Sequence, residues 1–75
     1  MMSVQTARKF LELLSANRGL QTQFYVSDPR TLDKLLTFAR GKGYIFTAEE
    51  LDAALSEFPA SPIIDFIRER TKVRA

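Results

Sequence analysis

The sequence of 75 residues contains no cysteine, no histidine and no tryptophan. Without cysteine the chain cannot be stabilised by disulfides, and with neither cysteine nor histidine a zinc site is not expected. Catalysis by a serine or cysteine nucleophile with a histidine base is excluded within the chain. The sequence therefore predicts a protein that is not an enzyme and that carries no metal or cofactor.

Long hydrophobic runs and a secretory signal are also missing. No apolar stretch approaches the roughly 20 residues that a bilayer-spanning helix needs, and the start, MMSVQTARKF, lacks the apolar core of a signal peptide. Hydrophobic residues make up 45% and charged residues 27% of the chain, which is ordinary for a globular domain. Together with the missing cysteine, these features predict a cytoplasmic protein without a membrane segment. They leave open whether it is a monomer or a homodimer.

Apolar residues recur at helical spacing along most of the chain. A first main helix is expected from Ser3, a good N-cap residue, to about Ala16. The stretch Asn17–Gly19 is a stop signal, because glycine adopts the left-handed conformation at low cost. Residues 20–26 are expected to form a short accessory helix, since no second strand is evident to pair with them as a strand.

The second main helix is expected to begin with Asp28 as its N-cap and Pro29 at its first position, where the missing N–H costs nothing. It is expected to close at Gly41 or Gly43.

The third main helix opens at Thr47, which together with Glu50 matches a capping box, and Pro59 is expected to end it. A short fourth helix is expected to follow, with Ser61 as its N-cap and Pro62 at its first position.

These segments predict an all-α fold, a small bundle of three main helices plus a short C-terminal fourth helix. Residues 1–67 are expected to form a single helical domain, and residues 68–75 a basic flexible tail. Phe46 immediately precedes the third helix and can pack as a hydrophobic staple against Leu51, so we expect Phe46 in the core. The Tyr44 ring is expected to lie over the end of the second helix.

Charge is unevenly distributed. Residues 1–42 carry seven basic and three acidic side chains, residues 43–67 carry five acidic and no basic ones, and residues 68–75 carry four basic and one acidic. Solvated helix faces and a loose tail explain this pattern, and so does contact with a partner. A DNA-reading helix-turn-helix is not favoured, because its reading helix would be the acidic AEELDAALSEF. Nucleic-acid contact could instead come from the basic tail, through Arg68, Arg70, Lys72 and Arg74.

Eight aromatic residues are more than a core of this size can bury fully. The remainder can form a contact patch, and apolar helix faces commonly dock in grooves of partner proteins. We therefore expect an unidentified protein partner to bind a patch made of aromatic and aliphatic side chains. The predicted patch consists of Phe24, Tyr25, Tyr44, Ile64 and Ile67.

The order of elements resembles a known family. A helix with FLELL, then SDPRTLDKLLTFARGKGY, then FTAEELDAAL is similar to the Nif-eleven domain, found in small bacterial proteins near nitrogen-fixation genes and in leader peptides of enzymatically modified natural products. The resemblance covers roughly residues 3–58. The positions that carry its pattern are Ala39, Gly43, Tyr44, Phe46, Thr47, Glu49, Glu50 and Leu51.

The resemblance implies a non-enzymatic helical binding module, a stand-alone family member with a link to nitrogen fixation. One alternative is a leader-type precursor that a modifying enzyme recognises. Such leaders usually end in a Gly-Gly-like cleavage site before a core rich in cysteine, serine or threonine. Here PASPIIDFIRERTKVRA follows Phe58, without a double glycine or a cysteine, and Thr71 is the only hydroxyl residue near its end. The other alternative is nucleic-acid binding through the basic tail.

Overall fold

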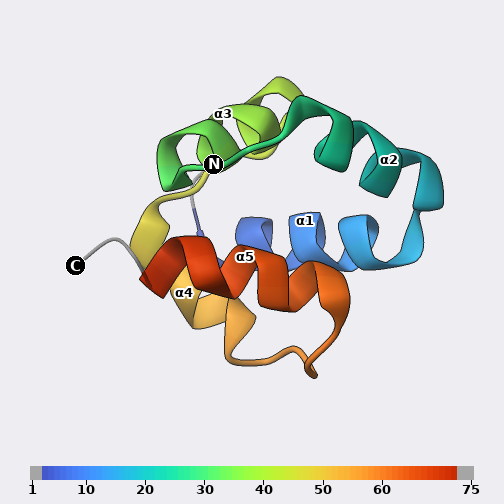
Figure 1. Ribbon diagram of the computed structural model, residues 1–75. Coiled ribbons are helices and arrows are strands. Elements are labelled where there is room, and N and C mark those ends of the chain that lie inside the picture. The colour runs from blue at the N-terminus through green and yellow to red at the C-terminus, as the bar shows by residue number, and fades with distance from the viewer. Residues whose placement is uncertain (1–2, 73–75) are drawn as a thin grey trace.

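The computed structural model describes residues 3–72, which form five α-helices and no strand (Figure 1). The all-α class is confirmed, but the expected count of three main helices and a short fourth is wrong. The second and last helices have ten and eleven residues, as long as the ten-residue helix between them that was expected to be a main one. The helices are α1 (Val4–Ala16), α2 (Arg18–Ser27), α3 (Leu32–Gly41), α4 (Ala48–Leu55) and α5 (Pro62–Lys72).

Helix α1 runs through the middle of the molecule (Figure 1). Helices α2 and α3 lie on one side of it, and α4 and α5 lie on the other. The most extensive pairing joins α1 to α4, and α1 also contacts α2 and α5. The molecule measures about 25 × 25 × 23 Å, so every helix reaches one shared core.

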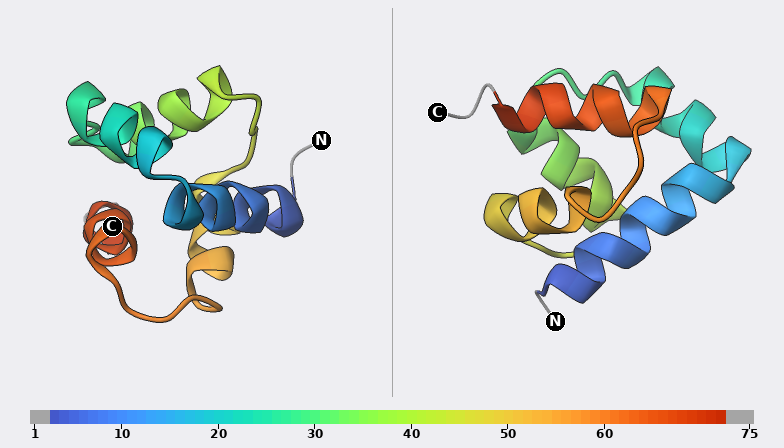
Figure 2. Two further views of the ribbon diagram at one scale, coloured as in Figure 1. Left: turned by 90° about the vertical axis from the view of Figure 1, so that its right-hand side faces the viewer. Right: turned by 90° about the horizontal axis from the view of Figure 1, so that it is seen from below.

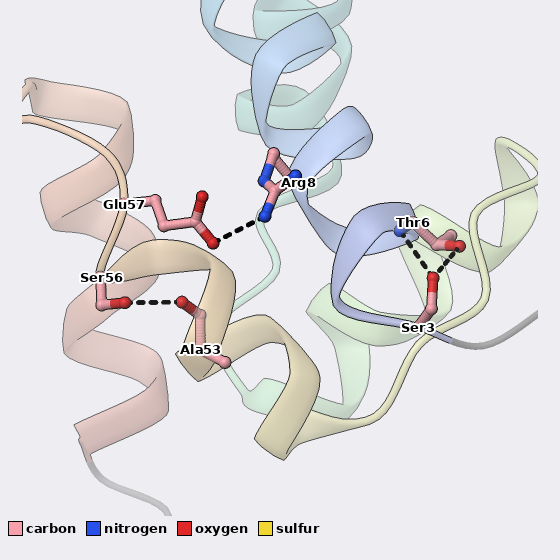
Figure 3. Close-up of polar contacts among 6 residues, drawn as sticks. All are labelled: Ser3, Thr6, Arg8, Ala53, Ser56 and Glu57. Carbon is pink, nitrogen blue, oxygen red and sulfur yellow. Dashed lines mark hydrogen bonds and ion pairs between the residues drawn. The ribbon is translucent and has the colours of Figure 1, made fainter.

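Asn17 separates α1 from α2 without a glycine turn. Its backbone N–H donates to the Leu13 carbonyl oxygen over 2.9 Å, which ends α1, and its side-chain oxygen accepts from the Leu20 N–H over 3.0 Å, which begins α2. Gly19 therefore lies inside α2, and the predicted left-handed stop at this glycine is wrong. At the other end of α1, Ser3 caps the helix as expected, by accepting from the Thr6 N–H over 3.1 Å (Figure 3).

Asp28 ends α2 instead of beginning α3. Because α2 continues to Ser27, the chain must turn at the next residue, and Asp28 does so in the left-handed region at φ 51°. Aspartate visits this region more readily than most residues. The N-cap of α3 is Thr31, whose hydroxyl accepts from the Lys34 N–H over 3.2 Å, so the predicted Asp28–Pro29 start is wrong.

The connection from α3 to α4 forms largely as its local sequence predicts. Gly41 is the last helical residue and Gly43 is left-handed at φ 93°. The Tyr44 N–H donates back to the Ala39 carbonyl oxygen over 2.9 Å, which satisfies one carbonyl of the last helical turn. The capping box at the start of α4 is confirmed, with Thr47 and Glu50 each accepting from the backbone N–H of the other over 3.1 and 2.8 Å.

The C-terminal part of the chain is more ordered than the sequence suggests. Ser61 caps α5 as predicted, but α4 ends at Leu55, four residues before Pro59. Residues 68–72, expected to begin a flexible tail, belong to α5. The Arg68 guanidinium holds them in place by donating to the carbonyl oxygens of Leu55 and Phe58, both over 2.8 Å. The rest of the predicted tail, residues 73–75, lies outside the described residues.

Two fully buried rings, Phe10 and Phe24, form the centre of the core. Phe10 of α1 contacts Phe38, Tyr44 and Phe46, with ring centroids 5.7 to 6.3 Å apart. Phe24 of α2 contacts Phe38 of α3 at 5.3 Å and a ring of α5 at 5.4 Å. The contacts of Phe38 with Phe10 and Phe24, and of Phe24 with the α5 ring, are edge-to-face. Pairs of this kind add to the energy of area burial. Aliphatic residues of all five helices complete the core; they are Ala7, Leu11, Leu14, Leu20, Leu35, Ala39, Leu51, Ala54, Leu55, Ile63, Ile64 and Ile67.

We predict that Phe46→Ala lowers the free energy of unfolding by roughly 3–5 kcal/mol, the usual cost of truncating a buried Phe. Phe46 is buried as expected and its ring packs on Phe10 at 5.7 Å. Ile45→Ala is the matched control, because its side chain is exposed and should change stability by less than about 1 kcal/mol. Urea denaturation followed by circular dichroism measures both. Equal losses in the two variants would contradict the assignment of Phe46 to the core.

Two neighbouring glycines should respond in opposite directions to alanine. Gly43→Ala forces a left-handed backbone on alanine and should destabilise by about 1–2 kcal/mol. Gly41→Ala lies in a helix, with open space around the new methyl group, and should stabilise by up to about 1 kcal/mol. Thermal unfolding of the two variants tests this, and a stabilising Gly43→Ala would show that the α3–α4 turn differs from the one described.

Candidate interaction surface

The five residues predicted as a contact patch do not lie together on the surface. Phe24 and Ile67 are fully buried and cannot contact a partner unless the fold opens, and Ile64 is only 1% exposed. Tyr44 is half-buried against Phe10 in the α3–α4 connection, with ring centroids 5.7 Å apart. Tyr25 alone of the five is exposed, at 46%. The predicted patch is therefore wrong as a surface: Tyr25 is exposed, Tyr44 is half-buried, and the other three residues lie beneath the surface.

Large apolar side chains that are exposed among the described residues include two adjacent ones at the end of α2, Tyr25 and Val26, the latter at 79%. The others are Leu13 of α1 and Ile45 before α4. The exposure of Val26 was not predicted, although the helical spacing indicates it. Leu20 and Phe24 are four apart and both face the core, so the next two residues must turn outward.

Beside Tyr25 the surface is hollowed into an open groove of about 350 Å³. It lies between the α1–α2 junction and the segment that leads into α5, and we call it the groove. None of the described residues that line it is charged. Its lining consists of Ser15, Gln21, Tyr25, Phe58, Pro59, Ser61, Pro62, Ile63 and Ile64. The predicted contact patch left out Phe58 and the two prolines, because the sequence places Phe58 on the apolar face of the third main helix and the prolines at helix ends.

At Tyr25 the groove adjoins a contact between α2 and α5. In the left view of Figure 2 both helices lie to the left of α1, with α2 above α5. The Tyr25 ring meets Phe66 edge-on, with ring centroids 5.6 Å apart and an interplanar angle of 84°. The Arg70 guanidinium lies over the same Phe66 ring, its central carbon 3.6 Å from the centroid. We call the groove together with Tyr25, Phe66 and Arg70 the α2–α5 face.

A second hollow, of about 330 Å³, lies between the end of α2 and α3. It is lined by Ser27, Pro29, Lys34, Thr37 and Phe38. Its two hydroxyl groups already donate to backbone carbonyl oxygens, from Ser27 to Phe24 and from Thr37 to Asp33, both over 2.8 Å. Because these donors are occupied by the protein itself, this hollow offers less for recognition than the groove.

The ion pair between Arg8 of α1 and Glu57, just beyond α4, spans 2.9 Å (Figure 3). Its hydrogen bond and the charge of Glu57 raise the pKa of Arg8, so Arg8 stays charged. The pair is exposed, and pairs of this kind contribute little to stability. The pair connects the segment after α4 to α1 at the protein surface.

Two acidic residues, Glu49 and Glu50, lie in the first turn of α4. Glu50 is used in the capping box, and within residues 3–72 no three carboxylates gather in a way that could hold a metal ion. None of the helices described is long and apolar enough to cross a bilayer.

The basic residues of the predicted tail are partly engaged in the fold. Arg68 binds two backbone carbonyl oxygens and Arg70 stacks on Phe66. The Lys72 side chain and Arg74 lie outside the part of the chain whose side chains are described. Two of the four bases expected to serve nucleic acid are therefore ordered elements of α5.

A family model of the Nif11 domain matches residues 2–51. No curated protein and no solved structure matches the chain significantly. The matched region includes α1 to α3 and the start of α4, whereas α5 lies outside it, so it is shorter than the stretch 3–58 that the resemblance suggested. Such a match indicates a small Nif11-like protein or a precursor peptide. Because the family model covers two thirds of the 75 residues, the chain belongs to the Nif11 domain family.

Proposed function

We propose that this protein is a non-catalytic docking module that binds a protein partner through the α2–α5 face. The observation that carries the proposal is an exposed aromatic ring, Tyr25, at the edge of an uncharged groove of about 350 Å³. Binding energy at protein interfaces is concentrated in a few aromatic and arginine anchors and in the pockets around them. The α2–α5 face combines both kinds of residue with a pocket.

The face is built to bind without large rearrangement. The Tyr25 ring packs edge-on against Phe24 and Phe66, with ring centroids 5.9 and 5.6 Å apart. Phe24 in turn is fully buried. A side chain that is already held in place loses little conformational entropy when a partner docks, so more of the contact energy is available as affinity.

The packing of α5, which follows the region matched by the Nif11 family model, is relevant to the precursor alternative. Ile63, Ile64 and Ile67 are buried in the core. Arg68 binds the carbonyl oxygens of Leu55, the last residue of α4, and of Phe58. A peptide that an enzyme processes must be accessible, whereas this segment completes the fold. That arrangement favours a stand-alone protein over a precursor whose product begins within residues 62–71. A role in nitrogen fixation stays a prediction.

Photo-crosslinking in the host cell tests the docking surface. With a benzophenone amino acid in place of Tyr25, we expect a crosslink to one protein partner. The matched control places the same group at Ile45, which is equally exposed, at 43%, but lies outside the groove. Crosslinks at both positions alike, or at position 45 alone, would show that the α2–α5 face is not the docking surface.

A chain that ends at Ser61 tests the precursor alternative. Removing α5 takes three buried isoleucines out of the core. Burial of each such side chain stabilises the fold by about 1.5–3 kcal/mol. Their sum, roughly 5–9 kcal/mol, is comparable with the whole stability of a small domain. We therefore expect the shortened chain to lose cooperative thermal unfolding and dispersed amide NMR signals. A shortened chain that stays folded would instead support a separable C-terminal segment.

A further inference from the structure

One wall of the groove comes partly from the connecting segment, residues 56–61, which joins α4 to α5 (Figure 1). We infer that Arg68 is the positioning residue of the groove, because its guanidinium holds this segment in the form that a partner binds. The inference rests on the proposed function and adds to it a residue that controls the shape of the docking surface. Arg68 is not among the residues that line the groove, so it acts through residues that do.

The Arg68 side chain bridges the end of α4 and the connecting segment. One nitrogen, Nη2, donates to the carbonyl oxygens of Leu55, the last residue of α4, and of Phe58, both over 2.8 Å. The last carbonyl groups of a helix lack partners inside the helix, and a basic side chain can satisfy them. Arg68 thus caps α4 from thirteen residues further along the chain.

The connecting segment has few backbone bonds of its own. The Phe58 N–H donates to the Leu55 carbonyl oxygen over 3.1 Å. Within residues 3–72 no backbone–backbone hydrogen bond is described for Pro59 or Ala60, and both residues are exposed. Hydrogen bonds from a charged donor are stronger than those between neutral groups. The bond from Arg68 to the Phe58 carbonyl oxygen therefore fixes the segment just before its least supported part.

The same contact fixes the two parts of the wall against each other. Phe58 and Pro59 line the groove from the connecting segment, whereas Ile63 and Ile64 line it from α5. Arg68 is four residues after Ile64 and so lies on the same stripe of α5. Because Ile64 is buried in the core, a bond from this stripe holds the segment against a fixed helix. A wall that is already in place need not be ordered when a partner docks, which leaves more of the contact energy as affinity.

NMR relaxation of the backbone amides tests whether Arg68 orders the segment. Arg68→Met keeps an unbranched apolar stem and removes the donors. We expect the order parameters of Phe58 and Ala60 to fall from about 0.85 to below about 0.6, the range of a flexible loop, while those of α1 stay unchanged. Arg68→Lys should restore them in part, because an ammonium can still donate to a carbonyl oxygen but lacks the planar fork of the guanidinium.

Two features of this measurement separate a local role from a structural one. Order parameters report motion within the folded state, so a general loss of stability does not change them at one segment alone. Arg40→Met, at an exposed base of α3, removes the same charge and should leave all order parameters unchanged. The buried isoleucines of α5 should keep Arg68→Met folded, as circular dichroism would show. An unfolded Arg68→Met would mean that Arg68 supports the whole domain, which would overturn the inference.

Photo-crosslinking then measures docking itself. With the benzophenone amino acid in place of Tyr25, the yield of the partner crosslink is normalised to the amount of protein in the cell. We expect Arg68→Met to lower this yield about tenfold, since ordering a mobile wall upon binding costs free energy. Arg68→Lys should give an intermediate yield, and Arg40→Met should match the original protein.

The outcomes distinguish this inference from the proposed function. Unchanged order parameters in Arg68→Met would overturn the inference whatever the crosslinks show. A mobile segment with an undiminished crosslink from position 25 would also overturn it, and would leave docking at the α2–α5 face intact. A missing crosslink in the protein with the original Arg68 would overturn the proposed function and, with it, the docking role of Arg68.

Discussion

The structure depends on a chain of ring contacts through the centre of the molecule. Phe10 and Phe24, both fully buried, meet through Phe38, whose ring packs against each of them. A 75-residue chain without cysteine depends on apolar packing for its stability, because small domains bury only a limited share of their surface. The contacts link α1, α2, α3 and α5, and Phe46 extends them to the start of α4.

The same contacts explain how the candidate surface arises. Phe24 packs on Phe66, and Tyr25 packs on both rings from outside. The ring cluster therefore reaches from the core to the surface between α2 and α5. Its outermost members cannot be covered by a chain this short. Exposed aromatic area at this place is a consequence of how the core is built, and it is also what a partner can use.

The helix starts that were predicted correctly are those whose capping hydrogen bond joins two residues of the same four-residue stretch. Ser3, Thr47 and Ser61 cap their helices through side chains that bond a backbone N–H three positions on. The errors fell where a choice depended on more distant structure. Asp28 was a sound N-cap by local rules, but the preceding helix runs on to it and makes it a turn. Arg68 was placed in a flexible tail because its acceptors lie ten and thirteen residues earlier.

The candidate site was harder to predict, because the number of aromatic residues does not show which of their side chains are exposed. Phe24 and Tyr25 are neighbours of similar size, yet one is fully buried and the other is exposed. The spacing of four from Leu20 turns Phe24 inward, but only the packing of α5 brings Phe66 against both rings. The groove also needs both parts of the chain. Gln21 and Tyr25 lie inside the region that matches the Nif11 domain, whereas the lining residues from 58 to 64 lie beyond it. A partner that binds the groove therefore contacts residues 58–64 as well as the matched region. A change in that later segment can alter which partner binds, while the Nif11 domain itself stays the same.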